Sequence, residues 1–189
     1  MGREDYQTSG RNGQLINFYT IRHMKQFLII FLSILMLAGA GVVIYKRIDF
    51  NQNCSGRLER AANANTVELA VKELDAAIQY AEDKGYTSGY TSVIYRTPDE
   101  DVEYWYNNLC ASRQELVNLP DSASTLEKTN TLMKLRETLT DTGEKGSYVI
   151  YPDGLQFYPH NFLWGIVRWF IWIALLLICG VIKVNGLKL

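Results

Sequence analysis

One stretch decides the fold: residues 27–45, FLIIFLSILMLAGAGVVIY, which contain no charged side chain. Lys25 precedes this run, and Lys46 and Arg47 follow it directly. At a rise of about 1.5 Å per residue, a helix of this length just crosses a hydrocarbon core of about 30 Å. The run therefore predicts a transmembrane helix with charged residues at both of its ends.

A second apolar run, residues 162–182, lies near the end of the chain. We predict a mainly α protein, in which two transmembrane helices flank an extramembrane helical bundle with a small β-hairpin. The predicted segments are a cytoplasmic tail (1–26), the first span (27–45), the extramembrane domain (46–161), the second span (162–182) and a second cytoplasmic tail (183–189). The alternative for the first run is a cleaved signal peptide, but the run is longer than the apolar part of a typical signal, and an uncleaved anchor is the preferred interpretation.

The charge between the two runs is strongly negative. Residues 48–161 contain 18 Asp and Glu against 10 Lys and Arg, a net charge of −8. Nucleic acid and anionic lipid surfaces attract clustered Lys and Arg, so the domain is not expected to bind either. Five basic residues flank the spans on the side of the termini and four on the side of the domain, which favours cytoplasmic termini and an extracytoplasmic domain.

Three helices are predicted within the domain from their start signals. These signals are Asn65 with Glu68, Thr97 with Pro98, and Ser124 with Glu127. The first helical pattern ends at Gly85, the second before Pro120, and the third at about Asp141. Each carries an apolar stripe that needs a partner, so the three helices are expected to pack as a bundle.

Three segments are not expected to be helical. Residues 1–20 are polar and without periodicity, which predicts a mobile tail. Residues 86–96, YTSGYTSVIYR, are rich in Tyr, Thr and β-branched residues and predict an extended connection or a short strand. Residues 147–158 place Pro152, Asp153 and Gly154 between two apolar runs, a pattern typical of a β-hairpin.

The sequence contains no recognisable catalytic set. His160 is the only histidine of the domain, and it lies at the predicted membrane boundary. The acidic run Asp99–Asp101 lacks the glycine and the distal glutamate of a calcium-binding loop, and acids are expected at a helix start in any case. We therefore expect no catalytic residue, no cofactor and no metal.

Two cysteines lie in the domain, Cys54 and Cys110. An extracytoplasmic domain allows a disulfide bond between them, and two buried free thiols are the equal alternative. Cys179, in the second run, is interpreted as a packing residue.

Three residues within the predicted spans are candidates for intramembrane or interface contacts. Arg168 lies seven positions into the second span, where its stem either reaches back to the interface or meets a partner. Gly39 and Gly41 allow close helix approach, either between the chain's own spans or in an oligomer.

A cluster of aromatic residues marks a possible partner or ligand surface, because Tyr and Trp have apolar rings with hydrogen-bonding groups. The candidates are Tyr90, Tyr95, Arg96 and Trp105, with a core position as the alternative for Trp105.

These observations favour a non-enzymatic structural or accessory subunit, anchored in the lipid bilayer, whose domain contacts another membrane protein or further copies of the same chain. The alternative is a ligand-binding or sensory domain that signals through a separate protein. The order of span, helical bundle and span resembles, in layout alone, the ligand-sensing region of bacterial chemoreceptor-like proteins. A pore or transporter element is the least favoured, because Arg168 is the one charged residue within the two runs.

Overall fold

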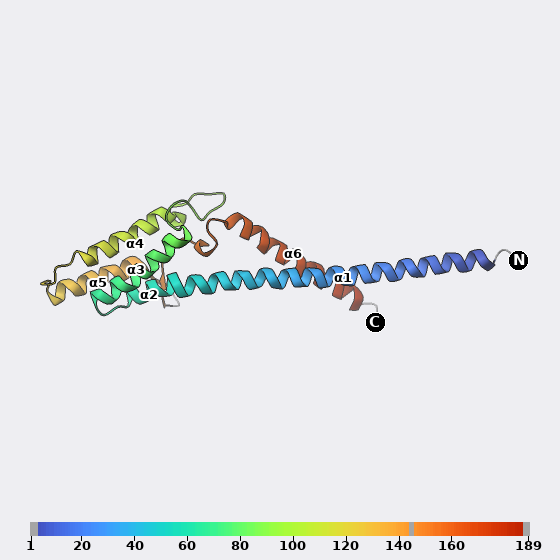
Figure 1. The fold of residues 1–189 in the computed structure, drawn as a ribbon, viewed down its shortest axis with the longest axis horizontal. Coiled ribbons are helices and arrows are strands. Elements are labelled where there is room, and N and C mark those ends of the chain that lie inside the picture. The colour runs from blue at the N-terminus through green and yellow to red at the C-terminus, as the bar shows by residue number, and fades with distance from the viewer. Residues whose placement is uncertain (1–3, 144–145, 187–189) are drawn as a thin grey trace. The chain divides into compact units, whose positions relative to one another are not determined.

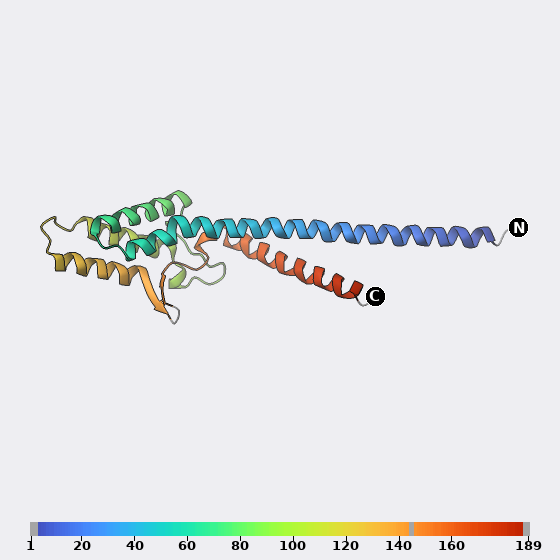
Figure 2. The same cartoon turned by 90° about the horizontal axis from the view of Figure 1, so that it is seen from below.

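The structure, a computed structural model, describes residues 4–143 and 146–186. The chain divides into two units, which are described separately: unit 1 is Met1–Val42 with Ile166–Leu189, and unit 2 is Val43–Gly165. Figures 1 and 2 show the ribbon from two sides. In chain order the elements are α1 (Glu4–Phe50), the π-helix η1 (Asn51–Ser55), α2 (Gly56–Ala62), α3 (Val67–Lys84), the 3₁₀ turn η2 (Pro98–Glu100), α4 (Val102–Val117), α5 (Thr125–Leu139), β1 (Thr140–Gly143), β2 (Gly146–Val149), the 3₁₀ turn η3 (Leu155–Phe157) and α6 (Asn161–Gly186).

Helix α1 is much longer than the predicted span. It begins at Glu4 and contains 47 residues, so the prediction of a non-helical tail over residues 1–20 is wrong from Glu4 onward. Gly10 and Gly13 each cost about 1 kcal/mol relative to alanine in a helix. Adding residues to an existing helix avoids the cost of nucleation, however, and the apolar run supplies that helix.

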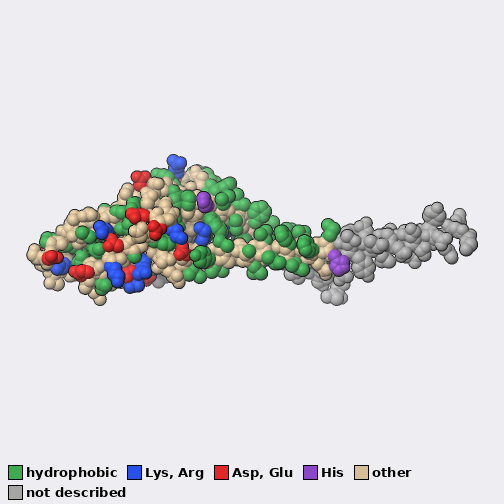
Figure 3. Space-filling model, viewed as in Figure 1, with side chains coloured by type: hydrophobic (Ala, Val, Ile, Leu, Met, Phe, Trp, Pro, Cys, Tyr) green, Lys and Arg blue, Asp and Glu red, His purple; other side chains and the backbone are tan. Residues whose placement is uncertain are grey.

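One helical stretch among the described residues, Gln26–Ala62, is long and apolar enough to cross a membrane. Within α6 the apolar stretch that the structure describes is Asn161–Leu177, which is shorter, so the second span is not confirmed. On the face seen in Figure 3, hydrophobic side chains are frequent along the coloured part of α1, whereas the charged side chains gather over the bundle helices.

A π turn joins α1 to α2 without a break. The N–H of Gly56 donates to the carbonyl oxygen of Asn51, five residues earlier. A Cβ at Gly56 would lie 2.6 Å from that oxygen, so the turn requires glycine at this position. In a regular α-helix of 3.6 residues per turn, residues spaced by four gradually rotate away from a common face. The wider π turn offsets this rotation, and Phe50, Cys54 and Leu58 are all buried on one face.

Two of the predicted helix starts lie at or beside the observed caps. Ser124 Oγ accepts a hydrogen bond of 3.2 Å from Glu127 N at the start of α5, as predicted. At the start of α3 the cap is Thr66, whose Oγ1 accepts from Leu69 N at 3.3 Å, and the assignment of the cap to Asn65 is wrong by one residue. Both residue types cap well, so composition alone does not separate them.

The third predicted start is displaced by four residues. Thr97 and Pro98 open the single turn η2 rather than the long helix. The backbone of Asp101 is then extended, because Asp101 forms an isolated β-bridge with Tyr90. Asp101 Oδ1 accepts from Tyr104 N at 3.0 Å and is the cap of α4.

Helices α2 to α5 pack around one hydrophobic core in unit 2, which confirms the predicted helical bundle (Figures 1 and 2). The largest fully buried side chains come from each of these helices and from the segments next to them: Phe50, Cys54, Leu58, Leu74, Val102, Leu109, Leu116, Leu139 and Leu155. The core therefore includes the end of α1 as well as the bundle helices.

The β-hairpin is real, but it lies earlier in the chain than predicted. Strands β1 and β2 pair in antiparallel register, with Thr140 opposite Val149 and Gly143 opposite Gly146. The predicted turn at Pro152–Gly154 instead leads into η3, because Gly154 has a φ of 76° and ends the extended segment. Helix α5 accordingly stops at Leu139 rather than at Asp141.

Candidate functional site

A small aromatic pocket lies where the start of α4 meets the segment after β2. Its volume is about 280 Å³, and its lining includes Asp99, Asp101, Tyr104, Trp105 and Tyr151. Trp105 is almost fully buried, and its Nε1 donates a hydrogen bond of 3.2 Å to the carbonyl oxygen of Ile150. Trp105 is thus both a core residue and part of a pocket wall.

The other three members of the predicted aromatic surface do not line this pocket. The Arg96 guanidinium lies over the Tyr90 ring, 5.4 Å from its centre, and Tyr95 is 77% exposed. The four residues named from the sequence therefore do not form one binding site around Trp105.

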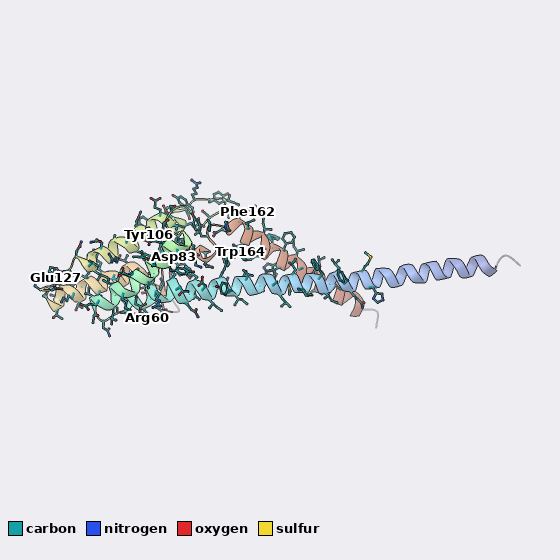
Figure 4. The ribbon with its side chains drawn as sticks, viewed as in Figure 1. Arg60, Asp83, Tyr106, Glu127, Phe162 and Trp164 are labelled. Atoms are coloured by element: carbon teal, nitrogen blue, oxygen red, sulfur yellow. The ribbon has the colours of Figure 1, made fainter. Side chains whose placement is uncertain are left out.

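A larger and more open groove lies between the start of α3 and the end of α4, and we call it the α3–α4 groove. Its volume is about 480 Å³. The apolar part of its lining is Val67, Val71, Leu116, Val117, Leu119 and Pro120, and the charged part is Glu68, Lys72, Asp75, Asp121 and Lys128. Glu127, the neighbour of Lys128, lies at the opposite end of unit 2 from Phe162 and Trp164 (Figure 4). The groove is thus apolar inside, with both signs of charge around it, at the end of the domain away from the chain's entry into α6.

Two ion pairs to the buried Glu73 connect α2 to α3. Glu73 is only 4% exposed, and its two oxygens accept from Arg57 at 2.9 Å and from Arg60 at 2.6 Å. Arg113 and Asp75, 2.6 Å apart, form an ion pair between α4 and α3 at the surface, where their side chains are 38% and 48% exposed. These charges are matched within the bundle, so their arrangement indicates a structural role rather than a catalytic one.

A second polar cluster ties the end of α1 to α3. Asp49 accepts from the Tyr80 hydroxyl and from Lys84 Nζ, each at 3.0 Å. Burial would raise the pKa of Asp49, but the hydrogen bonds from Lys84 and Tyr80 outweigh it and hold that pKa below its usual value. Burial raises the pKa of Tyr80, and it raises that of the neighbouring Tyr86 to about 12. Both phenols therefore stay protonated at neutral pH.

The cysteines are free thiols in this structure. Cys54 is buried, Cys110 is partly buried and Cys179 is exposed. The choice between a disulfide bond and two buried free thiols at Cys54 and Cys110 stays a prediction, and burial raises the pKa of the Cys54 thiol to about 12. A thiol buried in apolar surroundings is a poor nucleophile, so Cys54 is expected to be unreactive in the folded chain.

Within unit 1, Gly39 lies against α6. A Cβ built on Gly39 would be 3.5 Å from Ile171 Cδ1 and 3.6 Å from Val167 Cγ1, whereas a Cβ on Gly41 would meet nothing within 4 Å. The contact at Gly39 agrees with the interpretation that the small residues serve packing between the chain's own helices. Arg168 is exposed on α6.

Among the described residues, no group of three or more His, Cys, Asp and Glu side chains could hold a metal ion. The acidic run at the start of α4 is occupied by capping: Asp101 caps the helix, and Glu100 accepts from Thr97 Oγ1 at 2.8 Å. These hydrogen bonds account for the acids through helix-start geometry.

No protein-family model, no curated protein and no solved structure matches this chain. Its candidate sites are therefore judged by their geometry alone.

Two features of unit 2 were not found from the sequence. The α3–α4 groove is formed by residues about fifty positions apart, and a local sequence pattern does not bring such residues together. Residues 86–96 were predicted as an extended connection or a short strand, and the structure contains the connection, but the exposure of Val93, Ile94 and Tyr95 within it (54%, 82% and 77%) was not foreseen. The sequence signal for this exposure was three adjacent apolar residues within a segment otherwise rich in Thr, Ser and Gly.

Proposed function

We propose that this chain is a non-enzymatic, membrane-anchored subunit whose helical unit 2 contacts another protein of a membrane assembly. In this proposal α1 crosses the bilayer through residues 27–45 and α6 crosses it again through residues 162–182. Both termini are cytoplasmic, and residues 46–161 are extracytoplasmic. The charge-free run in α1 and the slight excess of basic residues on the side of the termini support this arrangement.

The observation that carries the proposal is the α3–α4 groove. An apolar lining with both signs of charge around it is the usual composition of a protein-binding surface, and a groove between helices suits an amphipathic helix of a partner. Val117, at the end of α4, lines the groove and is 48% exposed, so it offers apolar surface that the bundle itself does not cover. Glu127, next to the groove residue Lys128, lies at the opposite end of unit 2 from Phe162 and Trp164, where the chain enters α6 (Figure 4).

The test is the native mass of the tagged full chain after gentle extraction in detergent, with the co-purified proteins identified. We expect a discrete assembly of fixed composition, either with a partner or with further copies of the chain. The substitution Val117→Glu should remove the assembly, because it places a charge in the apolar lining.

The matched control is Met133→Glu. Met133 on α5 is similarly exposed, at 56%, but does not line the groove. The control should leave the assembly intact. A lone chain without partners, or equal loss of the assembly in both variants, refutes the proposal.

The alternative function, binding of a small ligand, is favoured by one observation, the aromatic pocket. Its carboxylates Asp99 and Asp101 and the rings of Tyr104 and Trp105 together suit a small organic cation. At about 280 Å³ the pocket is slightly smaller than most ligand pockets, which begin near 300 Å³. A cation that raises the melting temperature of the full chain, but not that of Tyr104→Ala, would support this alternative.

A further inference from the structure

Three adjacent apolar side chains, Val93, Ile94 and Tyr95, are exposed in a loop of unit 2, and we call this tripeptide the apolar tip. Ile94 is 82% exposed, more than any other large hydrophobic side chain that the structure describes, and Tyr95 is 77% exposed. Adjacent exposed apolar side chains mark a surface that meets either a protein or a membrane. The position of the tip decides between these two.

The base of the loop is joined to the segment that leads into α6. The Tyr158 hydroxyl donates a hydrogen bond of 2.6 Å to the carbonyl oxygen of Ser88. A Cβ at Gly89, where φ is +93°, would overlap that hydroxyl, so glycine is needed at this point. Tyr158 lies three residues before Asn161, the first residue of α6.

The loop is fixed on its other side as well. Val102 N donates to Gly89 O at 2.9 Å, and Thr91 N donates to Glu100 O at 3.0 Å. These two hydrogen bonds close the loop at its base, and residues 93–99 beyond them are all exposed. The apolar tip therefore lies on a loop whose two ends are held together.

Both chain segments that connect unit 2 to the proposed spans lie at this same end of the unit. Lys46 Nζ is 5.3 Å from the centre of the Trp164 ring, and the Phe157 ring lies 5.5 Å from that of Trp164. Lys46 follows the charge-free run directly, and Trp164 lies in the first turn of α6. The apolar tip is thus attached to the end of unit 2 where the chain leaves and re-enters the proposed bilayer, opposite to Glu127 (Figure 4).

We propose that the apolar tip inserts into the interfacial layer of the lipid bilayer and forms a third membrane contact of this chain, beside its two proposed spans. Val93 and Ile94 supply the apolar surface, and Tyr95 has the amphipathic ring that is enriched at membrane interfaces. Interfacial amphipathic helices bury their apolar face about 5–10 Å into the boundary between headgroups and acyl chains, and the tip is proposed to occupy the same layer. This inference rests on the proposed membrane anchoring.

Charge does not drive this insertion. Arg96 follows the tip, but its guanidinium lies over the Tyr90 ring, and the exposed Asp99 follows three residues later. The two charges oppose each other at an anionic surface, so the contact is expected to depend on apolar side chains and to form equally well with zwitterionic lipid.

The test uses the full chain, reconstituted in phosphatidylcholine vesicles, with an environment-sensitive fluorophore on one introduced cysteine. The background is Cys110→Ser with Cys179→Ala, and Cys54 is retained because it is fully buried. The labelled positions are Ile94→Cys at the tip, Leu126→Cys at the other end of unit 2, and Leu35→Cys within the charge-free run. Leu126 is 70% exposed, so it is the matched control for an exposed apolar side chain. Far-UV circular dichroism confirms that each labelled chain keeps its helices.

We expect the label at residue 94 to emit at shorter wavelength than the label at residue 126. Phosphatidylcholine with a nitroxide close to the headgroup should quench residue 94 and leave residue 126 unquenched, while a nitroxide deep in the acyl chain should quench residue 35. Equal emission and quenching at residues 94 and 126, with residue 35 quenched, overturns the inference and leaves the anchoring intact. A blue shift at residue 94 without lipid quenching means that protein covers the tip, which also overturns it. Absence of quenching at residue 35 refutes the membrane anchoring itself, and the inference with it.

Discussion

The substitution Glu73→Gln tests whether the buried charge between α2 and α3 stabilises unit 2. Glu73 is 4% exposed and accepts from two arginines, Arg57 at 2.9 Å and Arg60 at 2.6 Å. Glutamine has about the same volume as glutamate but only one acceptor oxygen. Its NH₂ group would face the second arginine, and both of these groups are hydrogen-bond donors. At least one charge-assisted hydrogen bond is lost.

The magnitude follows from the exposure of the partners. Hydrogen bonds to charged groups contribute about 1.5–3 kcal/mol, and breaking a fully buried ion pair costs about 3–5 kcal/mol. The side chains of Arg57 and Arg60 are 36% and 67% exposed, so both regain water when Glu73 is changed. We therefore expect Glu73→Gln to lower the free energy of unfolding by about 2 kcal/mol, near the lower of these two ranges.

The measurement is native-state hydrogen exchange of the full chain in detergent micelles, followed at the backbone amides of α2 and α3. The matched control is Glu115→Gln. Glu115 pairs with Lys134 at 2.7 Å between two exposed side chains, and its loss should cost about 0–1 kcal/mol. If the two variants differ by less than about 0.5 kcal/mol, the uncertainty typical of such comparisons, burial of the Glu73 pair has no energetic consequence and the reasoning fails.

Three further predictions follow from the glycine, tyrosine and cysteine environments of unit 2. Gly89→Ala should lower the melting temperature more than Gly85→Ala: both have positive φ, but only Gly89 faces the Tyr158 hydroxyl, and equal losses would contradict this. Burial raises the pKa of Tyr86 from 10.0 to about 12, so the unfolded chain ionises first and stability is lost as the pH rises from about 10 to about 12. Tyr86→Phe should reduce that alkaline loss, and an unchanged alkaline unfolding curve would disprove it. Because burial raises the pKa of Cys54 to about 12, iodoacetamide should modify Cys54 only as fast as the chain opens, and rapid alkylation of the folded protein would show otherwise.

Local signals in the sequence predicted the helices well. The pair Ser124 and Glu127 identified the start of α5 to the residue, because a cap depends on side chains within one turn. The cap of α4 was missed because Asp101 is extended by its bridge to Tyr90, eleven positions away. A local sequence pattern does not predict a bridge between residues eleven positions apart.

The hairpin shows a second limit of local reasoning. Two glycine-containing segments follow α5, one with Gly143 and Gly146 and one with Gly154, and either composition is compatible with antiparallel strands. The strands pair from Gly143 opposite Gly146 to Thr140 opposite Val149, and Ile150 N donates to Leu139 O at the end of α5. The pairing register decides between the two segments, and glycine composition alone does not contain it.

Candidate sites were harder to predict than helices and strands, because they too depend on contacts between residues far apart in the sequence. The sequence identified Trp105 and Gly39 as notable residues, and the structure gives each a packing partner. It did not identify the α3–α4 groove or the exposure of Ile94, since both depend on what lies beside a side chain rather than on its type.

The π turn at Asn51–Ser55 has a consequence for how this chain tolerates changes in length. A π turn holds one residue more than an α turn between the same two flanking helical segments. Deleting one residue there would leave a regular α-helix with Phe50 and Leu58 still facing the same way. The same deletion inside α3 would rotate every following side chain by about 100° and carry Leu74 or Ala77 out of the core. The junction is therefore the place in the helical part of unit 2 where evolution or engineering can remove a residue at least cost to the fold.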